Sequence, residues 1–268
     1  MIFSESAPAK LNLALHVRGK LPDGRHRLET VFAFCTDGDL LGAEEAEGLS
    51  LSATGPFAAE LSTDEDNLVF RAATLLREVA RTDQGALLSL QKNLPVASGI
   101  GGGSADAAAA LRLLTRLWKI DPAHASEVAP VLGSDVPACL LSMSARGVGA
   151  GDELELLNDP RISGTSVLLI NPLVPLSTGE VFGRWDGEDQ GPLSDWRDGR
   201  NDLEAPAVSL VPEIGEVLNW LLAQRGAAFV RMSGSGATCF ALFDHESARD
   251  EAASAVPERW WHLATYLR

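Results

Sequence analysis

A glycine-rich segment in the first half of the chain restricts its possible folds more than any other feature. The segment reads Pro95-Val96-Ala97-Ser98-Gly99-Ile100-Gly101-Gly102-Gly103-Ser104-Ala105-Asp106. Four glycines in five positions allow positive φ angles and expose successive backbone N–H groups. A strand is expected just before it (87–91) and a helix just after it (104–118), so the positive end of the helix dipole points into the same space. The segment therefore predicts a pocket for phosphate oxygens.

The same segment has other interpretations. A glycine-rich surface turn is one, but the preceding strand and the following helix favour phosphate binding. The segment lacks the Lys-Ser/Thr ending of a Walker A loop, and it comes too late, without a fitting βαβ unit, for a dinucleotide-binding fingerprint. Ser104 offers a hydroxyl to phosphate or to Mg2+. Asp106 could help to hold the metal, but an acidic residue that favours its own helix dipole is commoner, so the metal ligands stay unassigned.

Composition and charge limit the class of partner. Of the 268 residues, 46% are hydrophobic and 22% are charged, as in an ordinary soluble globular protein. The net charge of −15 argues against nucleic acid, although a local cationic cleft could still bind an anionic small molecule. No apolar run is long enough to span a membrane, and the start, MIFSESAPAK, lacks a signal-peptide pattern. We expect a cytoplasmic protein.

The cysteines give little support to a disulfide or metal framework. They are odd in number and scattered, at Cys35, Cys139 and Cys239. No CxxC pair and no Cys/His cluster has the spacing of a metal site. This pattern predicts buried thiols.

Apolar periodicity in the first part of the chain predicts a mixture of strands and helices. In the strand expected over Lys10–Val17, the apolar residues fall at every second position, so Lys10 and Asn12 share the opposite face. Acidic residues just before Asn67 are typical of a helix start. Strands are expected at 10–17, 28–34, 40–43, 49–53, 87–91, 144–150 and 152–156, and helices at 67–81, 104–118, 124–132 and 136–141.

Asn158-Asp159-Pro160 marks a domain boundary, and a second pattern follows it. Strands are expected at 166–170, 228–232, 238–243 and 260–267, and helices at 178–185, 201–208, 213–225 and 246–255. This β-α-α-β-β-α-β order predicts an antiparallel sheet backed by helices, in an α+β protein. The intervening segment 186–200 lacks periodicity and predicts a long mobile loop. The tryptophans Trp185 and Trp196 could belong to an interface or to a lid.

Three further motifs have ordinary interpretations when each is taken alone. A lysine such as Lys10 on a half-exposed strand is usually solvated. In the run from Gly133 to Pro137, Ser134 or Asp135 is typical of a helix N-cap. The segment Arg231–Thr238 contains a second glycine-serine run, which predicts either a simple hairpin or a loop that closes over phosphates or substrate.

Taken together and in this order, the motifs resemble the GHMP kinase superfamily, which includes galactokinase, homoserine kinase, mevalonate kinase and phosphomevalonate kinase. The resemblance covers nearly the whole chain and is greatest to the member that acts on a cytidine-bearing precursor in non-mevalonate isoprenoid synthesis. The matching segments are Ala7–Leu13, Asp23–Phe32, Asp66–Leu68, Gly99–Asp106, Leu132–Pro137, Asn201–Leu203 and Ser233–Thr238.

The resemblance implies a two-domain α+β fold and a kinase activity. It implies a ribosomal-protein-like α/β N-terminal domain that binds ATP, residues 1–157, and a ferredoxin-like C-terminal domain, residues 158–268. The implied reaction transfers the γ-phosphate of ATP, accompanied by Mg2+, to the 2-hydroxyl of a small-molecule cytidine diphosphate alcohol. Neither nucleic acid nor a membrane is an expected partner, and the oligomeric state is not predicted.

The resemblance also implies roles for individual residues. Asp135 would be the catalytic carboxylate beside the accepting hydroxyl, and Lys10 would pair with it and with the transferred phosphate. The substrate would contact Asn12, would meet His26 at the cytosine edge and would stack on Phe182. ATP would be bound by Asn67, close to the adenine or its ribose, and by Pro95, Val96, Ala97, Ser98, Gly99, Ile100, Gly101, Gly102, Gly103 and Ser104.

One residue departs from the family pattern. The tyrosine that the family has after Asp-Gly is Arg25 here. That tyrosine is expected to form the second wall of the cytosine stack. Because a guanidinium plane can stack on a base and also meet a diphosphate, we hypothesise that Arg25 replaces the ring. The alternative is a solvent-exposed arginine in a turn.

Two other functions compete with this interpretation. Another kinase of the superfamily, such as homoserine or mevalonate kinase, would not explain the Asp23–His26 run or the Gly-Gly-Gly-Ser sequence. A catalytically inactive nucleotide-binding module would typically lack the lysine or the aspartate, but Lys10 and Asp135 are both present.

Overall fold

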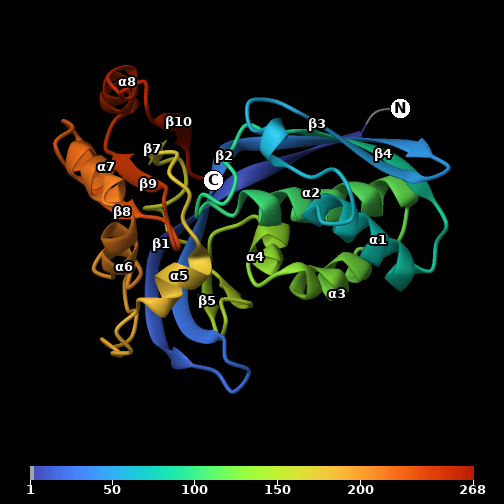
Figure 1. Cartoon of the computed structure of the whole chain (residues 1–268), viewed down its shortest axis with the longest axis horizontal. Helices are drawn as coiled ribbons and strands as arrows, with labels where there is room; N and C mark the ends of the chain where they lie inside the picture. The colour runs from blue at the N-terminus through green and yellow to red at the C-terminus, as the bar shows by residue number, and fades with distance from the viewer. Residues whose placement is uncertain (1–2) are drawn as a thin grey trace. The chain divides into compact units, whose positions relative to one another are not determined.

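The structure, a computed structural model, describes residues 3–268 (Figure 1). These residues form two compact units. Strands β1 (Phe3–Lys20) and β2 (His26–Ala46) contribute residues to both, so the units are not two successive pieces of the chain. The predicted boundary between residues 157 and 158 stays a prediction. Unit 1 consists of the described residues up to Ala9, Asp37–Val96 and Gly101–Ser142, and unit 2 consists of Lys10–Thr36, Ala97–Ile100 and Met143–Arg268.

Unit 1 packs helices against a small group of strands. β3 (Leu49–Thr54) runs parallel to β4 (Gly85–Gln91), and β4 pairs antiparallel with residues 40–46 of β2. The helices lie together on one side of β3 and β4 (Figure 1). They are α1 (Leu68–Ala80), α2 (Gly102–Trp118), α3 (Ala123–Leu132) and α4 (Val136–Leu141), and a 3-10 turn, η1, covers Ala58–Glu60. Most residues of α2 are buried because the other three helices pack against it.

Unit 2 contains a four-stranded antiparallel sheet in the order β10-β7-β9-β8. Its strands are β7 (Ser166–Asn171), β8 (Ala227–Met232), β9 (Cys239–Phe243) and β10 (Trp261–Tyr266). Helices α7 (Glu213–Leu222) and α8 (Glu246–Ser254) pack against the sheet and follow β7 and β9 in the chain. This is the ferredoxin-like βαββαβ arrangement, so the predicted antiparallel sheet backed by helices is confirmed.

The remaining elements of unit 2 are shorter. β5 (Ala145–Val148) pairs with residues 30–32 of β2, and β6 (Glu153–Leu156) pairs with β5. α5 (Thr178–Gly183) and α6 (Glu204–Leu210) pack on each other after β7. The three cysteines of the chain are buried thiols, as predicted.

The predicted elements are present, with informative differences. The strands predicted at 28–34 and 40–43 are parts of one strand, β2. The helix predicted from residue 201 begins at Glu204, because Asn201 forms a parallel bridge with Leu15 of β1. The prediction that Lys10 lies on a half-exposed face is wrong, since β1 is buried on both faces from Ala7 to Val17. Polar groups on such a strand need hydrogen-bond partners inside the protein.

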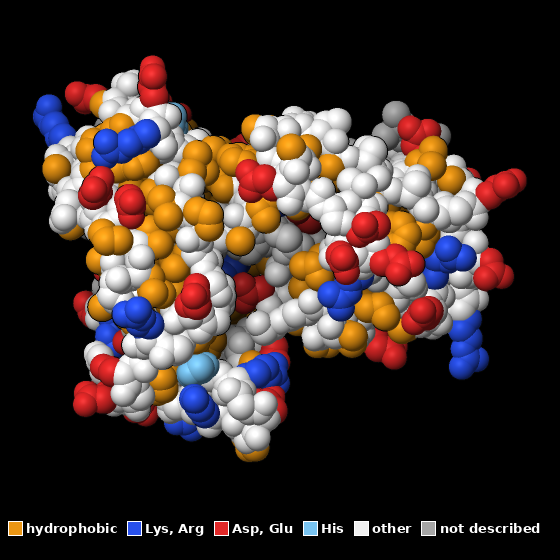
Figure 2. Space-filling model, in the orientation of Figure 1, with side chains coloured by type: hydrophobic (Ala, Val, Ile, Leu, Met, Phe, Trp, Pro, Cys, Tyr) orange, Lys and Arg blue, Asp and Glu red, His pale blue; other side chains and the backbone are white. Residues whose placement is uncertain are grey.

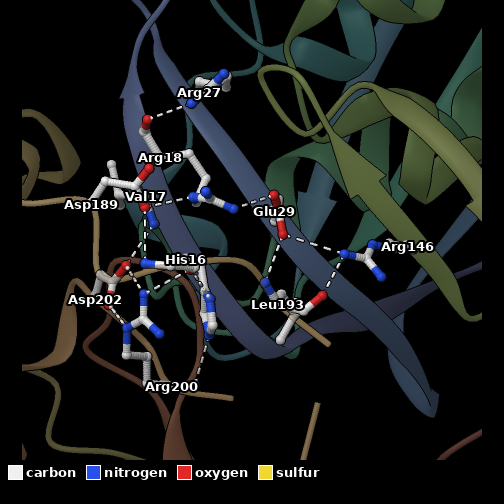
Figure 3. A network of polar contacts seen from close by, with 11 residues as sticks. His16, Val17, Arg18, Arg27, Glu29, Arg146, Asp189, Leu193, Arg200 and Asp202 are labelled. Atoms are coloured by element: carbon white, nitrogen blue, oxygen red, sulfur yellow. Dashed lines mark hydrogen bonds and ion pairs between the residues drawn. The ribbon is translucent and has the colours of Figure 1, made fainter. Parts of the chain in front are cut away.

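The segment 186–200 contains no helix or strand, but polar contacts tie it to β1 and β2 (Figure 3). Asp189 pairs with Arg18 at 2.6 Å, and the Leu193 N–H donates to the Glu29 carboxylate at 2.7 Å. Trp196 is buried at 2% exposure, so the interpretation of this tryptophan as a lid or interface residue is wrong. The segment is therefore a fixed strap, not the predicted mobile loop, and we call residues 186–200 the strap.

His16 links the strap to β1 through both ring nitrogens (Figure 3). Its Nε2 accepts a hydrogen bond from the Arg200 backbone N–H at 3.1 Å, so the proton is on Nδ1, which donates to the Gly191 carbonyl at 3.1 Å. Burial lowers the pKa of His16. The hydrogen bond to the Gly191 carbonyl raises this pKa, and the Arg200 charge lowers it. The carboxylates of Asp202 and Glu29 raise the pKa by smaller amounts. The structure thus favours the neutral imidazole.

We expect the His16 contribution to stability to disappear in acid. It is complete above the unfolded-state pKa of about 6.5 and is lost as the pH falls through the lower folded-state pKa. Urea unfolding of the wild type and of His16→Gln should therefore show a larger difference in the free energy of unfolding at about pH 8 than at about pH 5.5. A difference that does not change with pH would contradict the expectation.

Candidate active site

Lys10 and Asn12 form a buried polar pair in β1 of unit 2. Each is 3% exposed. Lys10 Nζ donates to Asn12 Oδ1 at 2.8 Å, and Asn12 Nδ2 donates to the Thr30 hydroxyl at 2.8 Å. Nζ also lies 5.5 Å from the centre of the Phe32 ring. Because the ammonium is largely removed from water, it would attract a nearby anion more strongly than a surface lysine would.

Two turns of unit 2 meet beside this pair. The Ser233 hydroxyl accepts from the Asn12 backbone N–H at 3.1 Å and donates to the Gly99 carbonyl at 3.0 Å. The Lys10 backbone N–H donates to the Ile100 carbonyl at 2.9 Å. The structure therefore brings together residues 97–100 of the glycine-rich segment, the second glycine-serine turn and the polar pair of β1. The alternative that the second turn is only a hairpin does not account for these contacts.

The rest of the glycine-rich segment lies in unit 1 and begins α2. Gly101 is the N-cap, with φ of +64°, and the helix begins two residues before the predicted start. The first helical hydrogen bond runs from the Ala105 N–H to the Gly101 carbonyl at 2.7 Å. The N–H groups of residues 102–104 precede this bond, and Gly103 is exposed. Such a helix start offers the donors that bind phosphate in other proteins.

A buried triad of charges lies directly under this helix start. Lys92 Nζ is 2.6 Å from Asp39 Oδ2 and 2.6 Å from Asp106 Oδ2, and each of the three side chains is at most 4% exposed. A Cβ on Gly102 would lie 3.0 Å from Lys92 Nζ, so a side chain there would require the ammonium to shift. Sequence reasoning missed this triad. No local pattern indicated it, because its three residues come from separate segments of the chain.

Asp106 has an unusual environment inside the triad. Burial raises its pKa to about 7; the Lys92 ammonium opposes this change and the Asp39 carboxylate adds to it. Its Oδ1 is buried without a hydrogen-bond partner among residues 3–268. The structure therefore favours an internal ion pair with Lys92 over both interpretations offered by the sequence, a metal ligand and an exposed acid that favours the helix dipole.

Asn67 and Asp135 begin two other helices of unit 1. Asn67 caps α1, with Oδ1 accepting from the Val69 N–H at 2.8 Å. Asp135 has helical backbone angles (φ −84°, ψ −16°), and within the described chain its side chain makes no capping bond to α4. Asp135 therefore occupies the predicted N-cap position, but its side chain is not used for capping. Because Lys10 belongs to unit 2 and Asp135 to unit 1, their predicted convergence stays a prediction.

Two aromatic rings of unit 2 contact His26. Its imidazole stacks on Phe182 with centroids 4.6 Å apart, and Trp185 meets it edge-on at 5.6 Å. Burial lowers the pKa of His26, and the charge of Lys20 lowers it further. The structure thus brings together the two predicted cytosine contacts and adds Trp185, whose role the sequence left open.

Arg25 lies in the exposed turn between β1 and β2. Its side chain is 54% exposed and pairs with Asp23 at 2.7 Å and with Asp152 at 3.2 Å. These two carboxylates hold the guanidinium plane. Whether it stacks on a base stays a prediction.

Charged side chains of both signs are spread over the face shown in Figure 2. Acidic groups are the more frequent, in agreement with the net charge of −15. A continuous basic surface, which nucleic-acid binding requires, is not seen among the described residues on this face.

Comparison with known families identifies the class of protein. The family described as "GHMP kinases N terminal domain" matches residues 67–143, and the one described as "GHMP kinases C terminal" matches residues 184–262. Together these matches cover more than half of the chain. The chain belongs to the GHMP kinase family.

Curated relatives of this GHMP kinase have a common name. A protein of Rhizorhabdus wittichii named 4-diphosphocytidyl-2-C-methyl-D-erythritol kinase is 50% identical over 99% of this chain and 94% of its own length. A protein of Novosphingobium aromaticivorans with the same name is 50% identical over 100% of this chain and 94% of its own length.

Solved structures agree in fold. The crystal structure of a 4-(cytidine 5'-diphospho)-2C-methyl-D-erythritol kinase matches this GHMP kinase with a TM-score of 0.85 and 33% identity, covering 99% of each chain. Homoserine kinase from Cytophaga hutchinsonii matches with a TM-score of 0.73 at 18% identity, over 99% of this chain and 94% of its own, which supports the fold alone. Within residues 3–268, no helix has both the length and the apolar character needed to cross a membrane.

Removing the central cation of the triad should destabilise the protein strongly. Lys92→Met leaves Asp39 and Asp106 buried without their ion-pair partner, and breaking a buried pair in this way costs about 3–5 kcal/mol. Urea unfolding measures the loss. The control, Lys119→Met, changes an exposed lysine at the end of α2 and should alter the free energy of unfolding by less than about 0.5 kcal/mol. Equal stabilities of the two variants would contradict the structural role of the triad.

Proposed function

We propose that this GHMP kinase transfers the γ-phosphoryl group of ATP to the 2-hydroxyl of 4-diphosphocytidyl-2-C-methyl-D-erythritol, a step of non-mevalonate isoprenoid synthesis. One observation carries the proposal: curated kinases named for this substrate are 50% identical over essentially the whole chain. The GHMP kinase family supplies ATP as the phosphate donor. Buried thiols without disulfides among the described residues agree with a reducing compartment, and we place the reaction in the cytoplasm.

The reaction exchanges one phosphorus–oxygen bond for another. The substrate hydroxyl oxygen bonds to the γ-phosphorus, while the bond from that phosphorus to the bridging oxygen of ADP breaks, and the hydroxyl loses its proton. We assign Asp135 to the orientation of this hydroxyl and to acceptance of the proton. Because phosphoryl-transfer transition states are loose, orientation contributes more than early proton removal.

We assign Lys10 to the charge on the transferred group. Its ammonium is buried and held by Asn12 at 2.8 Å, so it has little freedom to reorganise during the reaction. Such a preorganised charge stabilises the developing negative charge more effectively than a solvated lysine. The proposed reaction requires both Lys10 and Asp135 to reach the same phosphoryl group.

We assign the binding of the triphosphate to the glycine-rich segment and the start of α2. The exposed Gly103 and the N–H groups of residues 102–104 fit this role, since phosphate oxygens accept from helix N-termini. A nucleotide-bound Mg2+ takes most of its ligands from phosphates and water, and the Ser104 hydroxyl is the group of this segment that could hold it. When bound, Mg2+ would neutralise phosphate charge.

We assign the cytosine of the substrate to the rings of His26 and Phe182. The stacked arrangement of these rings offers an aromatic face, and the lowered pKa of His26 favours a neutral imidazole that can accept or donate a hydrogen bond. A panel of acceptors tests the substrate: the wild type should phosphorylate the cytidine diphosphate alcohol and leave homoserine and mevalonate unchanged. Phosphorylation of either of the latter two alone would reject the assignment.

Replacing the proposed catalytic carboxylate should separate binding from turnover. Asp135→Ala should bind ATP with an affinity close to that of the wild type but lose most of kcat, by about 10²-fold or more, because the hydroxyl is no longer oriented. Steady-state kinetics and nucleotide titration measure the two properties. Asp83→Ala, at an exposed aspartate of unit 1, is the control and should keep both. Near-wild-type turnover of Asp135→Ala would reject its catalytic role.

Arg25 tests how the cytosine is enclosed. If its guanidinium stacks on the base, Arg25→Ala should raise the KM for the cytidine substrate by about 10-fold, as loss of a base-stacking partner does. Arg25→Tyr, which restores the ring of the family pattern, should keep a KM close to that of the wild type. An unchanged KM in both variants would leave Arg25 as an exposed arginine of the turn.

A further inference from the structure

Asn201 is a buried amide directly after the strap, and it has no role in the proposed function so far. It is 8% exposed. Its Nδ2 donates two hydrogen bonds to backbone carbonyls of the second glycine-serine turn, to Met232 at 2.9 Å and to Gly234 at 2.8 Å. Its Oδ1 accepts from the Leu203 N–H at 3.0 Å. All the hydrogen-bonding groups of the side chain except one acceptor position are therefore used, and two of the bonds hold the turn.

The backbone on either side of Asn201 is itself fixed to β1. The Leu15 N–H donates to the Arg200 carbonyl at 2.8 Å, and the Asp202 N–H donates to the Leu15 carbonyl at 2.9 Å. The Asp202 carboxylate also accepts from the Val17 N–H at 2.7 Å (Figure 3). Asn201 thus projects from a segment that cannot shift without breaking strand-like hydrogen bonds. It can act as a rigid brace for the turn.

The turn that Asn201 holds contacts the glycine-rich segment and the polar pair of β1. The Ser233 hydroxyl bonds both the Asn12 N–H and the Gly99 carbonyl, as described above. In addition, the Thr238 N–H donates to the Ser98 carbonyl at 3.1 Å. A displacement of the turn would therefore move Ser98, Gly99 and Asn12 with it.

The turn and the glycine-rich segment are tightly packed against each other. A Cβ on Gly234 would lie 3.0 Å from the Gly99 carbonyl oxygen and 3.1 Å from Asn12 Oδ1. A Cβ on Gly99 would lie 2.4 Å from the Gly236 carbonyl oxygen. Two main-chain segments this close transmit a shift of a few tenths of an ångström directly, because interiors packed at this density have no free volume to absorb it.

We propose that Asn201 is a positioning residue for phosphoryl transfer. Its amide fixes the turn 233–236, and through this turn it fixes Asn12, the hydrogen-bond partner of Lys10, and residues 98–99 of the glycine-rich segment. The inference rests on the proposed function, which assigns Lys10 and this segment to the transferred phosphate. The inference adds Asn201, which lies outside β1 and the glycine-rich segment, as a residue that determines the positions of Lys10 and of that segment.

Asn201→Asp is the sharpest test because it is nearly isosteric. Aspartate keeps the acceptor for the Leu203 N–H but replaces the two donors with an oxygen that repels the Met232 and Gly234 carbonyls. We expect kcat to fall by about 10²-fold, the cost of a displacement of about 1 Å, and the Kd for ATP to rise by about 10-fold. If Asn201 served only to cap the turn before α6, aspartate would be an equally good cap, and both constants would stay near wild type. That result would overturn the proposal.

Asp202→Asn is the matched control. It changes the neighbouring residue, whose carboxylate accepts from the Val17 N–H and from the Arg200 guanidinium. It should lose stability in urea unfolding and keep kcat and the Kd for ATP within about threefold. A loss of kcat in this control equal to that of Asn201→Asp would assign the effect to the whole segment next to β1 and overturn the specific role of Asn201.

Ser233→Ala covers the case in which Asn201→Asp does not fold. It removes the hydroxyl that links the turn to Asn12 and Gly99 by hydrogen bonds. This variant should reproduce the fall in kcat and the rise in the Kd for ATP. Wild-type constants in Ser233→Ala would reject the proposed route. If the wild type does not phosphorylate the cytidine substrate, the proposed function fails on its own. The Kd for ATP, titrated without an acceptor, then still decides whether Asn201 positions the nucleotide site.

Discussion

The close approach of two turns determines the geometry of unit 2. Residues 98–99 lie against residues 233–236. Carbonyl oxygens of the facing segment occupy the space where a side chain of residue 99 or residue 234 would lie, so these two positions require glycine. One hydroxyl, that of Ser233, bonds to both Asn12 and Gly99. The position of the turn therefore determines the position of a strand and of a loop that are far apart in the sequence.

Two lysines of the described residues, Lys92 and Lys10, are buried in different surroundings. Lys92 is surrounded by two carboxylates, so its charge is neutralised locally and it stabilises the start of α2. Lys10 donates to the amide oxygen of Asn12 at 2.8 Å and lies over the Phe32 ring. A buried ammonium attracts an anionic ligand more strongly than a solvated ammonium does, because the surrounding dielectric is lower.

Several features could be predicted from local sequence alone. The glycine-rich segment predicted a helix start, and the structure places that start at Gly102. The order of apolar runs after residue 160 predicted the antiparallel sheet, because strand alternation and helix periodicity are local properties. The mobility of the strap was predicted wrongly, since the ion pair of Asp189 with Arg18 joins residues that are distant in the sequence.

The amino-acid sequence by itself determined the elements, the glycine positions and the family pattern, because these depend on residues that are neighbours in the chain. Tertiary structure decided the surroundings of each charge. By sequence Asp106 could be a metal ligand or an acid that favours its own helix, and only the folded chain places Asp39 of β2 and Lys92, the residue after β4, beside it. The sequence likewise shows Asn201 only as a polar residue at a predicted helix. In the folded chain its amide contacts the turn 233–236. Hydrogen bonds and ion pairs of this kind join groups that only the folded chain brings within 3 Å, so no local pattern can encode them.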